Sequence, residues 1–200
     1  MKISVLIEGK TELAFKNHLI SFLHTRLERN MPKIRFISYD GRIPKKQKLK
    51  RIVENLIHDG DDLVIALTDL YTGVNDFKDA NDAKRKMRQW VGKISNFVPH
   101  VAKHDFEAWL IPYWPVIQKL AKHNKSRPGN PEDINNNKPP AKHLIEIFEI
   151  GKCRKSYNKP RDAKRILNGQ DLLVSAQECA ELKKFLNTII QHCDHSKQIV

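Results

Sequence analysis

The chain has 200 residues, and 40% of them are hydrophobic, which is enough for one compact core. Its 36 Lys and Arg against 23 Asp and Glu give a formal net charge of +13 at pH 7. This excess favours a polyanionic partner, with nucleic acid as the first candidate and a merely solubilising basic surface as the alternative. The three widely spaced cysteines and the absence of an apolar run of ~18–20 residues predict a cytoplasmic protein without a disulfide framework or a membrane span.

Strands and helices are expected to alternate over the first part of the chain. Short apolar or alternating runs predict strands over Lys2–Ile7, Lys33–Tyr39, Asp62–Thr68 and Phe97–Ala102. Helical spacing predicts helices over Thr11–Arg29 with Thr11 as N-cap, Lys46–His58, Asp79–Lys93, and His104–His123 with interruptions near Pro112 and Pro115. This order predicts an α/β fold whose mostly parallel sheet is covered by helices on both faces.

The composition changes at Asn124, where a segment rich in Asn, Pro and Lys begins ("NKSRPGNPEDINNNKPP"). A loop of this length inside a compact domain is usually functional or disordered, and we expect it to fold over the functional site. Helices are predicted to resume over Ala141–Ile150, Arg161–Leu167 and Gln177–Cys193. We therefore predict an α/β domain over residues 1–123, and a loop insertion with a helical extension, packed on that domain, over residues 124–200.

Acidic side chains follow three of the predicted strands. Glu8 and Glu12 come after the first strand, Asp69 after the third, and Asp105 with Glu107 after the fourth. Parallel strands end at one edge of a sheet, where ligands usually bind, so Glu8, Asp69, Asp105 and Glu107 are expected to lie at the same edge, with Glu12 four residues beyond Glu8. Oxygen ligands of this kind suit Mg²⁺ or Mn²⁺, which can polarise a phosphoryl oxygen and activate water. The alternative for each acid alone is a helix-terminal role favoured by the helix dipole.

Basic residues form clusters that could contact the phosphates of a nucleic acid without reading its sequence. The alternative for each cluster is a solvated helix face. Lys10 lies inside the acidic turn, where it could position a phosphate or simply offset Glu8 and Glu12. The predicted nucleic-acid-binding residues are Lys45, Lys46, Lys48, Lys50, Arg51, Lys84, Arg85, Lys155, Lys159 and Arg161.

Five segments together resemble a known protein family: "IEGKTELAF", "ALTDLYTG", "KHDFEAWL", "PEDINNNKPPAKHL" and "YNKPRDAKRIL". The acid-Gly turn after the first strand and the Asp after the third resemble the Toprim domain of topoisomerases, primases and OLD-family nucleases. "EGKTE" is most similar to the OLD-type opening, in which a second acid follows the first by four residues. More narrowly, the chain resembles a small Toprim-related family of bacterial proteins, over almost its whole length.

The resemblance assigns roles to individual residues. Glu8 would be a metal ligand or general acid/base, Glu12 a metal ligand, and Asp69 the first aspartate of the Toprim DxD motif. Tyr71 stands where the second aspartate is expected, and a hydroxyl with an ordinary pKa of about 10 is a poor Mg²⁺ ligand. Glu107, and after it Asp105, are the candidates to complete the metal site. Glu8, Asp69 and Lys10 are the expected catalytic residues.

The resemblance implies an Mg²⁺- or Mn²⁺-dependent nuclease acting on DNA or RNA. By analogy with OLD-type proteins, it also implies a separate ABC-type ATPase as partner and a role in defence against phage. Because Tyr71 replaces one ligand, a second function stays open: a degenerate Toprim module that binds nucleic acid or a protein partner without cutting. The sequence does not separate DNase from RNase activity.

Overall fold

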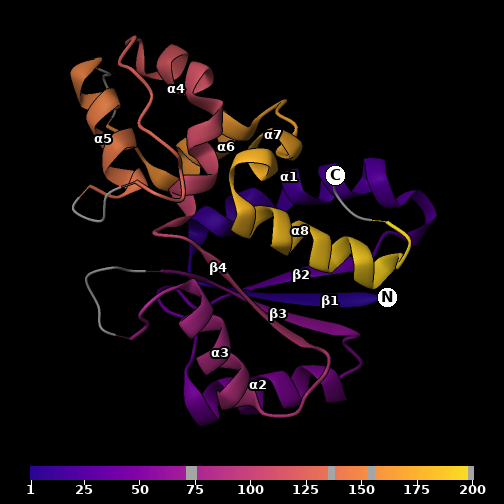
Figure 1. Cartoon of the computed structure of the whole chain (residues 1–200). Helices are drawn as coiled ribbons and strands as arrows, with labels where there is room; N and C mark the ends of the chain where they lie inside the picture. The colour runs from indigo at the N-terminus through magenta and orange to yellow at the C-terminus, as the bar shows by residue number, and fades with distance from the viewer. Residues whose placement is uncertain (71–75, 135–137, 153–155, 198–200) are drawn as a thin grey trace.

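The computed structural model describes residues 1–70, 76–134, 138–152 and 156–197. Four parallel strands form one sheet in the order β2-β1-β3-β4, with β1 at Lys2–Ile7, β2 at Lys33–Ser38, β3 at Leu63–Asp69 and β4 at Phe97–Ala102 (Figure 1). The predicted α/β fold is confirmed, and each observed strand lies within one residue of its predicted bounds.

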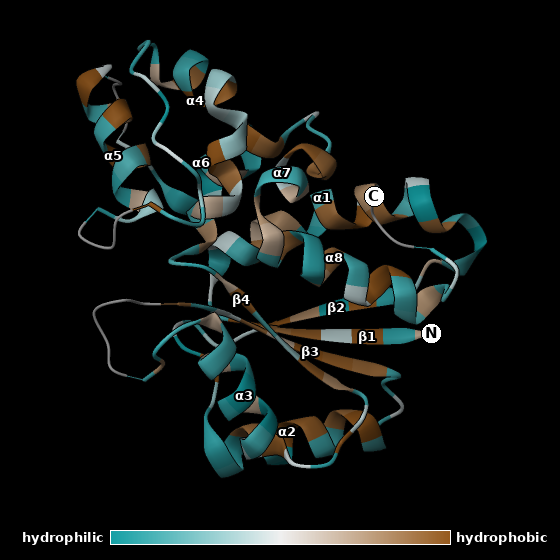
Figure 2. Ribbon diagram, viewed as in Figure 1, coloured by the Kyte–Doolittle hydropathy of each residue, from teal (hydrophilic) through white to brown (hydrophobic). Residues whose placement is uncertain are grey.

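Helices cover both faces of this sheet (Figure 1). Helices α1 (Lys10–Leu27) and α8 (Ala180–Cys193) pack on one face, and α2 (Lys46–His58) and α3 (Ala80–Val91) on the other. In β1, Ile3, Val5 and Ile7 point into the first layer while Leu6 points into the second. Every residue of β3 is buried, and the strand is apolar from Leu63 to Leu67, as expected for a strand covered on both faces (Figure 2).

The 3₁₀ helix η1 (Glu28–Asn30) joins α1 to the start of β2. The other helices lie beyond the α1 side of the sheet, toward the end where the strands finish (Figure 1). They are the 3₁₀ helix η2 (Phe106–Tyr113), α4 (Trp114–Ala121), α5 (Pro140–Ile150), α6 (Lys159–Leu167) and α7 (Leu172–Glu178). In the described residues, no helix is long and apolar enough to cross a membrane.

Three predictions about helices were wrong. The helix predicted over His104–His123, with interruptions near Pro112 and Pro115, is divided near Pro112, but its first part, η2, is a 3₁₀ helix and α4 begins only at Trp114. Pro112 cannot donate a backbone hydrogen bond inside an α-helix, whereas Pro115 is tolerated in the first turn of α4. The helix over Gln177–Cys193 is divided at Cys179, whose extended backbone separates α7 from α8. Gly9, not Thr11, is the N-cap of α1.

The last helix joins the same core as the first part of the chain. Phe185 of α8 stacks on Trp109 of η2 with ring centroids 5.9 Å apart, and its ring lies 6.5 Å from Phe15 of α1. His100 of β4 packs edge-on against Phe185 at 5.5 Å. Residues before and after 123 therefore contribute to one hydrophobic cluster, while a domain boundary at that position stays a prediction.

The described part of the Asn- and Pro-rich segment contacts the turn after β4 and the start of α8. The backbone amide of Glu181 donates to Glu132 Oε1 at 2.9 Å, and Lys103 pairs with Asp133 at 3.0 Å. The ring Nε2 of His104 lies 3.2 Å from the carbonyl oxygen of Glu132. These contacts hold the segment beside the start of α8.

Candidate active site

The candidate site lies where the neighbouring strands β1 and β3 end. The chain leaves β1 toward β2 on one side and leaves β3 toward β4 on the other, and ligands of open α/β sheets bind at such a point. A cavity of about 150 Å³ opens there. Four of the predicted metal-binding acids line it, namely Glu8, Glu12, Asp69 and Glu107, together with Lys159. The structure thus brings together acids from α1, β3, η2 and the turn that follows β1.

Glu8 is held at the end of β1 by the neighbouring strand and by the loop after β2. Its side chain is almost fully buried, and its Oε1 accepts a hydrogen bond from the hydroxyl of Thr68 on β3. The backbone amide of Gly41 donates to the carbonyl oxygen of Glu8 at 2.8 Å. The residue therefore has a defined position between two strand ends.

Glu107 is the most deeply buried of the cavity's acids, with 1% of its residue surface exposed. Lys159, the first residue of α6, donates to Glu107 Oε2 at 3.1 Å. The hydroxyl of Tyr157 donates a longer hydrogen bond of 3.4 Å to Oε1. Both donors come from a segment 50 residues or more further along the chain. The sequence predicted Lys159 only as a phosphate contact and gave Tyr157 no role, although both belong to the "YNKPRDAKRIL" segment.

Burial and mutual repulsion raise the pKa values of two acids in this cluster, Asp69 and Glu12. Burial raises the pKa of Asp69 well above its ordinary value, and the negative charges of Glu12, Glu8, Asp105 and Glu107 raise it further. Burial also raises the pKa of Glu12, with Glu107 adding to the effect. The ammonium group of Lys159 loses some stability through burial, but Glu107 and Asp105 outweigh this and raise its pKa. Lys159 is therefore a cation held at the rim of an anionic cavity.

Asp105 lies next to the cluster without lining the cavity. Its Oδ2 accepts from the backbone amide of Ala141 at 3.2 Å, while its Oδ1 is buried and has no hydrogen-bond partner. Burial and the nearby Glu107 raise its pKa to about 7. A buried carboxylate oxygen without a donor needs a compensating positive charge or a proton.

The residues present fit a hard divalent cation by donor type. All four acids at the cavity supply carboxylate oxygens, the ligand type that such ions prefer, and their mutual repulsion would be relieved by a bound cation. Within the described ranges, no three His, Cys, Asp or Glu side chains already converge closely enough to hold one ion. Glu8 instead turns to Thr68, and Glu107 to Tyr157 and Lys159. Ion binding would thus require side-chain rotations that exchange these donors for the metal.

Other predicted site residues lie away from the cavity or outside the described ranges. Lys10 is exposed at the start of α1 and is not part of the cavity lining. None of the described residues of the Asn- and Pro-rich segment lines the cavity either. Tyr71 and Lys155 lie outside the described residues.

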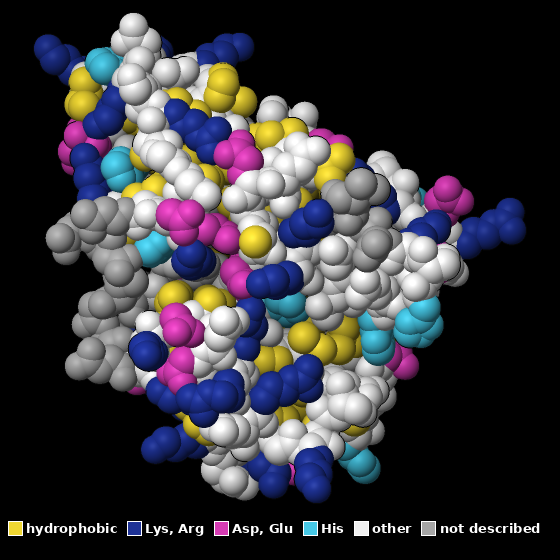
Figure 3. Space-filling model, viewed as in Figure 1, with side chains coloured by type: hydrophobic (Ala, Val, Ile, Leu, Met, Phe, Trp, Pro, Cys, Tyr) yellow, Lys and Arg dark blue, Asp and Glu magenta, His cyan; other side chains and the backbone are white. Residues whose placement is uncertain are grey.

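The predicted basic residues occupy several surfaces, and most of them pair with acids. Lys and Arg side chains gather over the part of the surface formed by α2 and α3 (Figure 3). Lys46, Lys48 and Arg51 are exposed on α2, and Lys50 lies 3.8 Å from Glu54. The remaining pairs are Lys45 with Asp76, Lys84 with Glu181, Arg85 with Asp82, and Arg161 with Asp162.

The fold and site define an α/β protein with an acidic cavity at the carboxyl edge of a parallel sheet. The chain belongs to the family described as a domain of unknown function (DUF4276), whose model matches residues 7–190. None of the curated proteins compared with the chain matches it.

Solved structures of similar fold come from OLD proteins. The C-terminal region of the Burkholderia pseudomallei OLD protein superposes with a TM-score of 0.56 at 12% identity, covering 94% of this chain and 98% of that one. The C-terminal region of the Xanthomonas campestris pv. campestris OLD protein gives a TM-score of 0.48 at 16% identity, covering 97% and 95%. The similarity to the Burkholderia structure, at 12% sequence identity, shows that the two chains share a fold.

Proposed function

We propose that this protein is a Toprim-type nuclease that hydrolyses phosphodiester bonds of DNA or RNA with Mg²⁺ or Mn²⁺. The observation that carries the proposal is the convergence of Glu8, Glu12, Asp69 and Glu107 on one cavity, beside Lys159, in a chain of net charge +13. In such an arrangement the acids would bind the metal ion, and the basic residues around them would attract a polyanionic substrate. The fold shared with the C-terminal region of an OLD protein supports the Toprim relationship.

Each residue at the cavity has a distinct part in this proposal. Glu8, Glu12, Asp69 and Glu107 would hold the ion, which would supply Lewis-acid stabilisation and a more acidic bound water. Thr68 orients Glu8, and Tyr157 orients Glu107. Lys159 would turn its ammonium group from Glu107 to a non-bridging phosphate oxygen, where negative charge must be stabilised.

Glu107 takes the place that the DxD motif leaves open. Tyr71 replaces the second aspartate of that motif, so a further carboxylate is needed at the cavity. Glu107 meets this need because it is buried, lines the cavity and raises the pKa of Asp69 through its charge. Asp105 does not line the cavity, and in this proposal it would act only through its electrostatic interaction with Glu107.

The cellular setting of the proposal rests on analogy of domain pairing. OLD-type proteins combine a Toprim nuclease with an ABC-type ATPase, so we place a separate ATPase chain beside this protein, in the cytoplasm and in defence against phage. Among the described residues no helix could span a membrane, which agrees with this setting.

The test is cleavage of labelled single- and double-stranded DNA and of RNA, with EDTA, Mg²⁺ or Mn²⁺. Glu8→Gln and Asp69→Asn should each lower the rate by about 100-fold or more. Glu54→Gln removes a partly exposed α2 carboxylate away from the cavity and should cut like the wild type. A second readout is the melting temperature, which Mn²⁺ should raise in the wild type and leave unchanged in Asp69→Asn. Cutting that survives both cavity changes would exclude this site.

The binding-module alternative is favoured by one observation, the Tyr71 that stands in place of a ligand. Such a module would bind nucleic acid in EDTA with equal affinity in the wild type and in Glu8→Gln. It would also fail to cut with Mn²⁺ after its ATPase partner is added. Those two results together would replace the nuclease proposal.

A further inference from the structure

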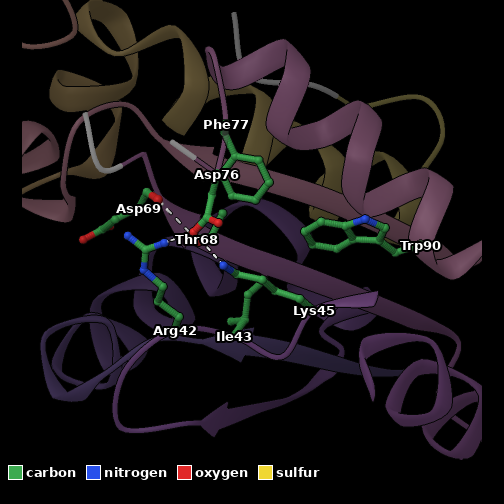
Figure 4. Close-up of a pocket in the computed structure, with 8 residues that line it drawn as sticks. All are labelled: Arg42, Ile43, Lys45, Thr68, Asp69, Asp76, Phe77 and Trp90. Carbon is green, nitrogen blue, oxygen red and sulfur yellow. Dashed lines mark hydrogen bonds and ion pairs between the residues drawn. The ribbon is translucent and has the colours of Figure 1, made fainter. Parts of the chain in front are cut away.

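A second, smaller cavity adjoins the acidic one and shares Asp69 with it. Its volume is about 10 Å³, room for roughly one water molecule. Figure 4 shows that the side chains of Arg42 and Lys45 converge on Asp76 at this cavity, which Asp69 also lines. A pair of basic side chains therefore lies directly beside the site proposed to bind metal.

The side chains of Arg42 and Lys45 bind one carboxylate together. Asp76 Oδ2 accepts from Arg42 Nη1 and also from Lys45 Nζ, the latter at 2.6 Å. Hydrogen bonding to Lys45 and the charges of Lys45 and Arg42 lower the pKa of Asp76. The carboxylate is therefore an anion at neutral pH, and it shows that this pair of cations can hold an anion.

Backbone contacts fix this pair relative to the acidic cavity. Gly41, which precedes Arg42, donates its amide to Glu8 and also lines the acidic cavity. Lys45 directly precedes α2, whose first turn contains no acid and whose N-terminus has no side-chain cap. The positive end of the α2 dipole therefore adds to the attraction for an anion held between Arg42 and Lys45.

We propose that Arg42 and Lys45 form a phosphate-binding subsite, and that Asp76 occupies it until a phosphate of the nucleic-acid strand displaces the carboxylate. The inference rests on the proposed function and deepens it. It assigns the subsite to a phosphate next to the one that would lie at Asp69. Guanidinium and ammonium groups bind phosphate oxygens as they bind carboxylate oxygens, so the exchange keeps both hydrogen bonds.

The exposure of the three side chains makes this exchange easy. Arg42, Lys45 and Asp76 keep 31%, 38% and 29% of their side-chain surface exposed. Ion pairs between partly exposed side chains contribute little to the stability of a fold, so losing the internal carboxylate costs little. A phosphate of a nucleic-acid strand also brings its neighbouring phosphates to the basic surface, whereas the Asp76 carboxylate is a single anion.

The test uses Asp76→Asn and Asp76→Ala, with Glu146→Gln as matched control. Glu146 on α5 also pairs with two basic residues, Lys125 and Lys138, so its replacement makes the same change in charge and also releases two cations. Binding of labelled single-stranded DNA, and of RNA of the same sequence, is measured by fluorescence anisotropy in EDTA at several salt concentrations. Urea unfolding of each variant checks that it is folded.

The subsite predicts tighter binding by the Asp76 variants, by about 3- to 10-fold relative to Glu146→Gln, since the competing carboxylate is gone. The double change Arg42→Gln with Lys45→Gln should weaken binding and reduce the salt dependence by about one phosphate contact. In that double variant, replacing Asp76 should bring no gain. An Asp76 variant that binds no more tightly than Glu146→Gln would overturn the proposal, and so would a gain that persists without Arg42 and Lys45.

This experiment separates the subsite from the nuclease proposal. Binding in EDTA does not require turnover, so a protein that never cuts could still show the predicted affinity changes. Conversely, metal-dependent cutting by the wild type together with unchanged binding by the Asp76 variants would leave the nuclease in place and remove the subsite.

Discussion

Replacing Asp105 by Asn should stabilise the metal-free protein at alkaline pH. Asp105 is 5% exposed, and its Oδ1 is buried without a hydrogen-bond partner. Burial and the neighbouring Glu107 raise its pKa from 3.8 to about 7. The unfolded chain therefore releases this proton at a lower pH than the folded protein does. The carboxyl group opposes folding increasingly as the pH rises through that interval, and fully above about 7.

The difference between the two pKa values sets the size of the effect. At about 1.4 kcal/mol per pH unit, the step from 3.8 to about 7 corresponds to about 4 kcal/mol of lost stability. An Asn side chain keeps the size and the acceptor for the Ala141 amide, at 3.2 Å in the wild type, but it adds an amide group that must find its own partner. We therefore expect a gain of about 2–4 kcal/mol at pH 8, falling below about 1 kcal/mol at pH 4.5.

The assay is urea unfolding with EDTA at pH 8 and at pH 4.5, followed by circular dichroism. Asp133→Asn is the control, because its side chain is 64% exposed and pairs with Lys103 at the surface. It should change the free energy of unfolding by less than about 0.5 kcal/mol at either pH. The reasoning from burial and repulsion would be refuted if Asp105→Asn were no more stable than the wild type at pH 8. It would also be refuted if the variant gained the same free energy of unfolding at both pH values.

Three further predictions concern catalysis, packing and acid stability. Lys159→Gln removes the cation beside Glu107 and should lower the single-turnover cleavage rate by about 100-fold, with a smaller effect on binding measured in EDTA. Phe185→Ala should lower the free energy of unfolding by about 3–5 kcal/mol in urea, because this fully buried ring joins α8 to the sheet core. Burial lowers the pKa of His100 to about 3, so the unfolded chain takes up its proton first and stability should fall by up to about 3 kcal/mol between pH 6.5 and pH 4. His100→Gln, which can keep a hydrogen bond to Thr188, should reduce that pH dependence of urea unfolding.

Each of these predictions has a matched comparison. Lys164→Gln removes an exposed α6 lysine outside the acidic cavity and should cut normally; equal loss in both lysine variants would mean a general charge effect. Leu13→Ala removes a side chain that is 45% exposed and should cost far less than Phe185→Ala; similar costs would contradict the packing assignment. If the stability of His100→Gln falls between pH 6.5 and pH 4 as much as that of the wild type, His100 does not cause the loss of stability in acid.

The amino-acid sequence by itself determined the framework of the protein. Apolar and alternating runs located the four strands of the described residues, and helical spacing located most of the helices. The alternation of strands with helices favours a parallel sheet covered on both faces. Because parallel strands finish at one edge, the positions of Glu8 after the first predicted strand and of Asp69 after the third already predicted that they would meet. These features follow from local periodicity and from a general rule of chain connection.

Only the tertiary structure decided which partners complete the site. Lys159 meets Glu107 across 52 positions of sequence, and Asp76 binds Arg42 across 34. Lys10, adjacent to the acids in sequence, is exposed at the start of α1, while the distant Lys159 lines the cavity. Such pairings depend on how α6 and the loop after β2 pack against the strand ends. Local periodicity reports which face of an element is buried, but it carries no information about the element that covers that face.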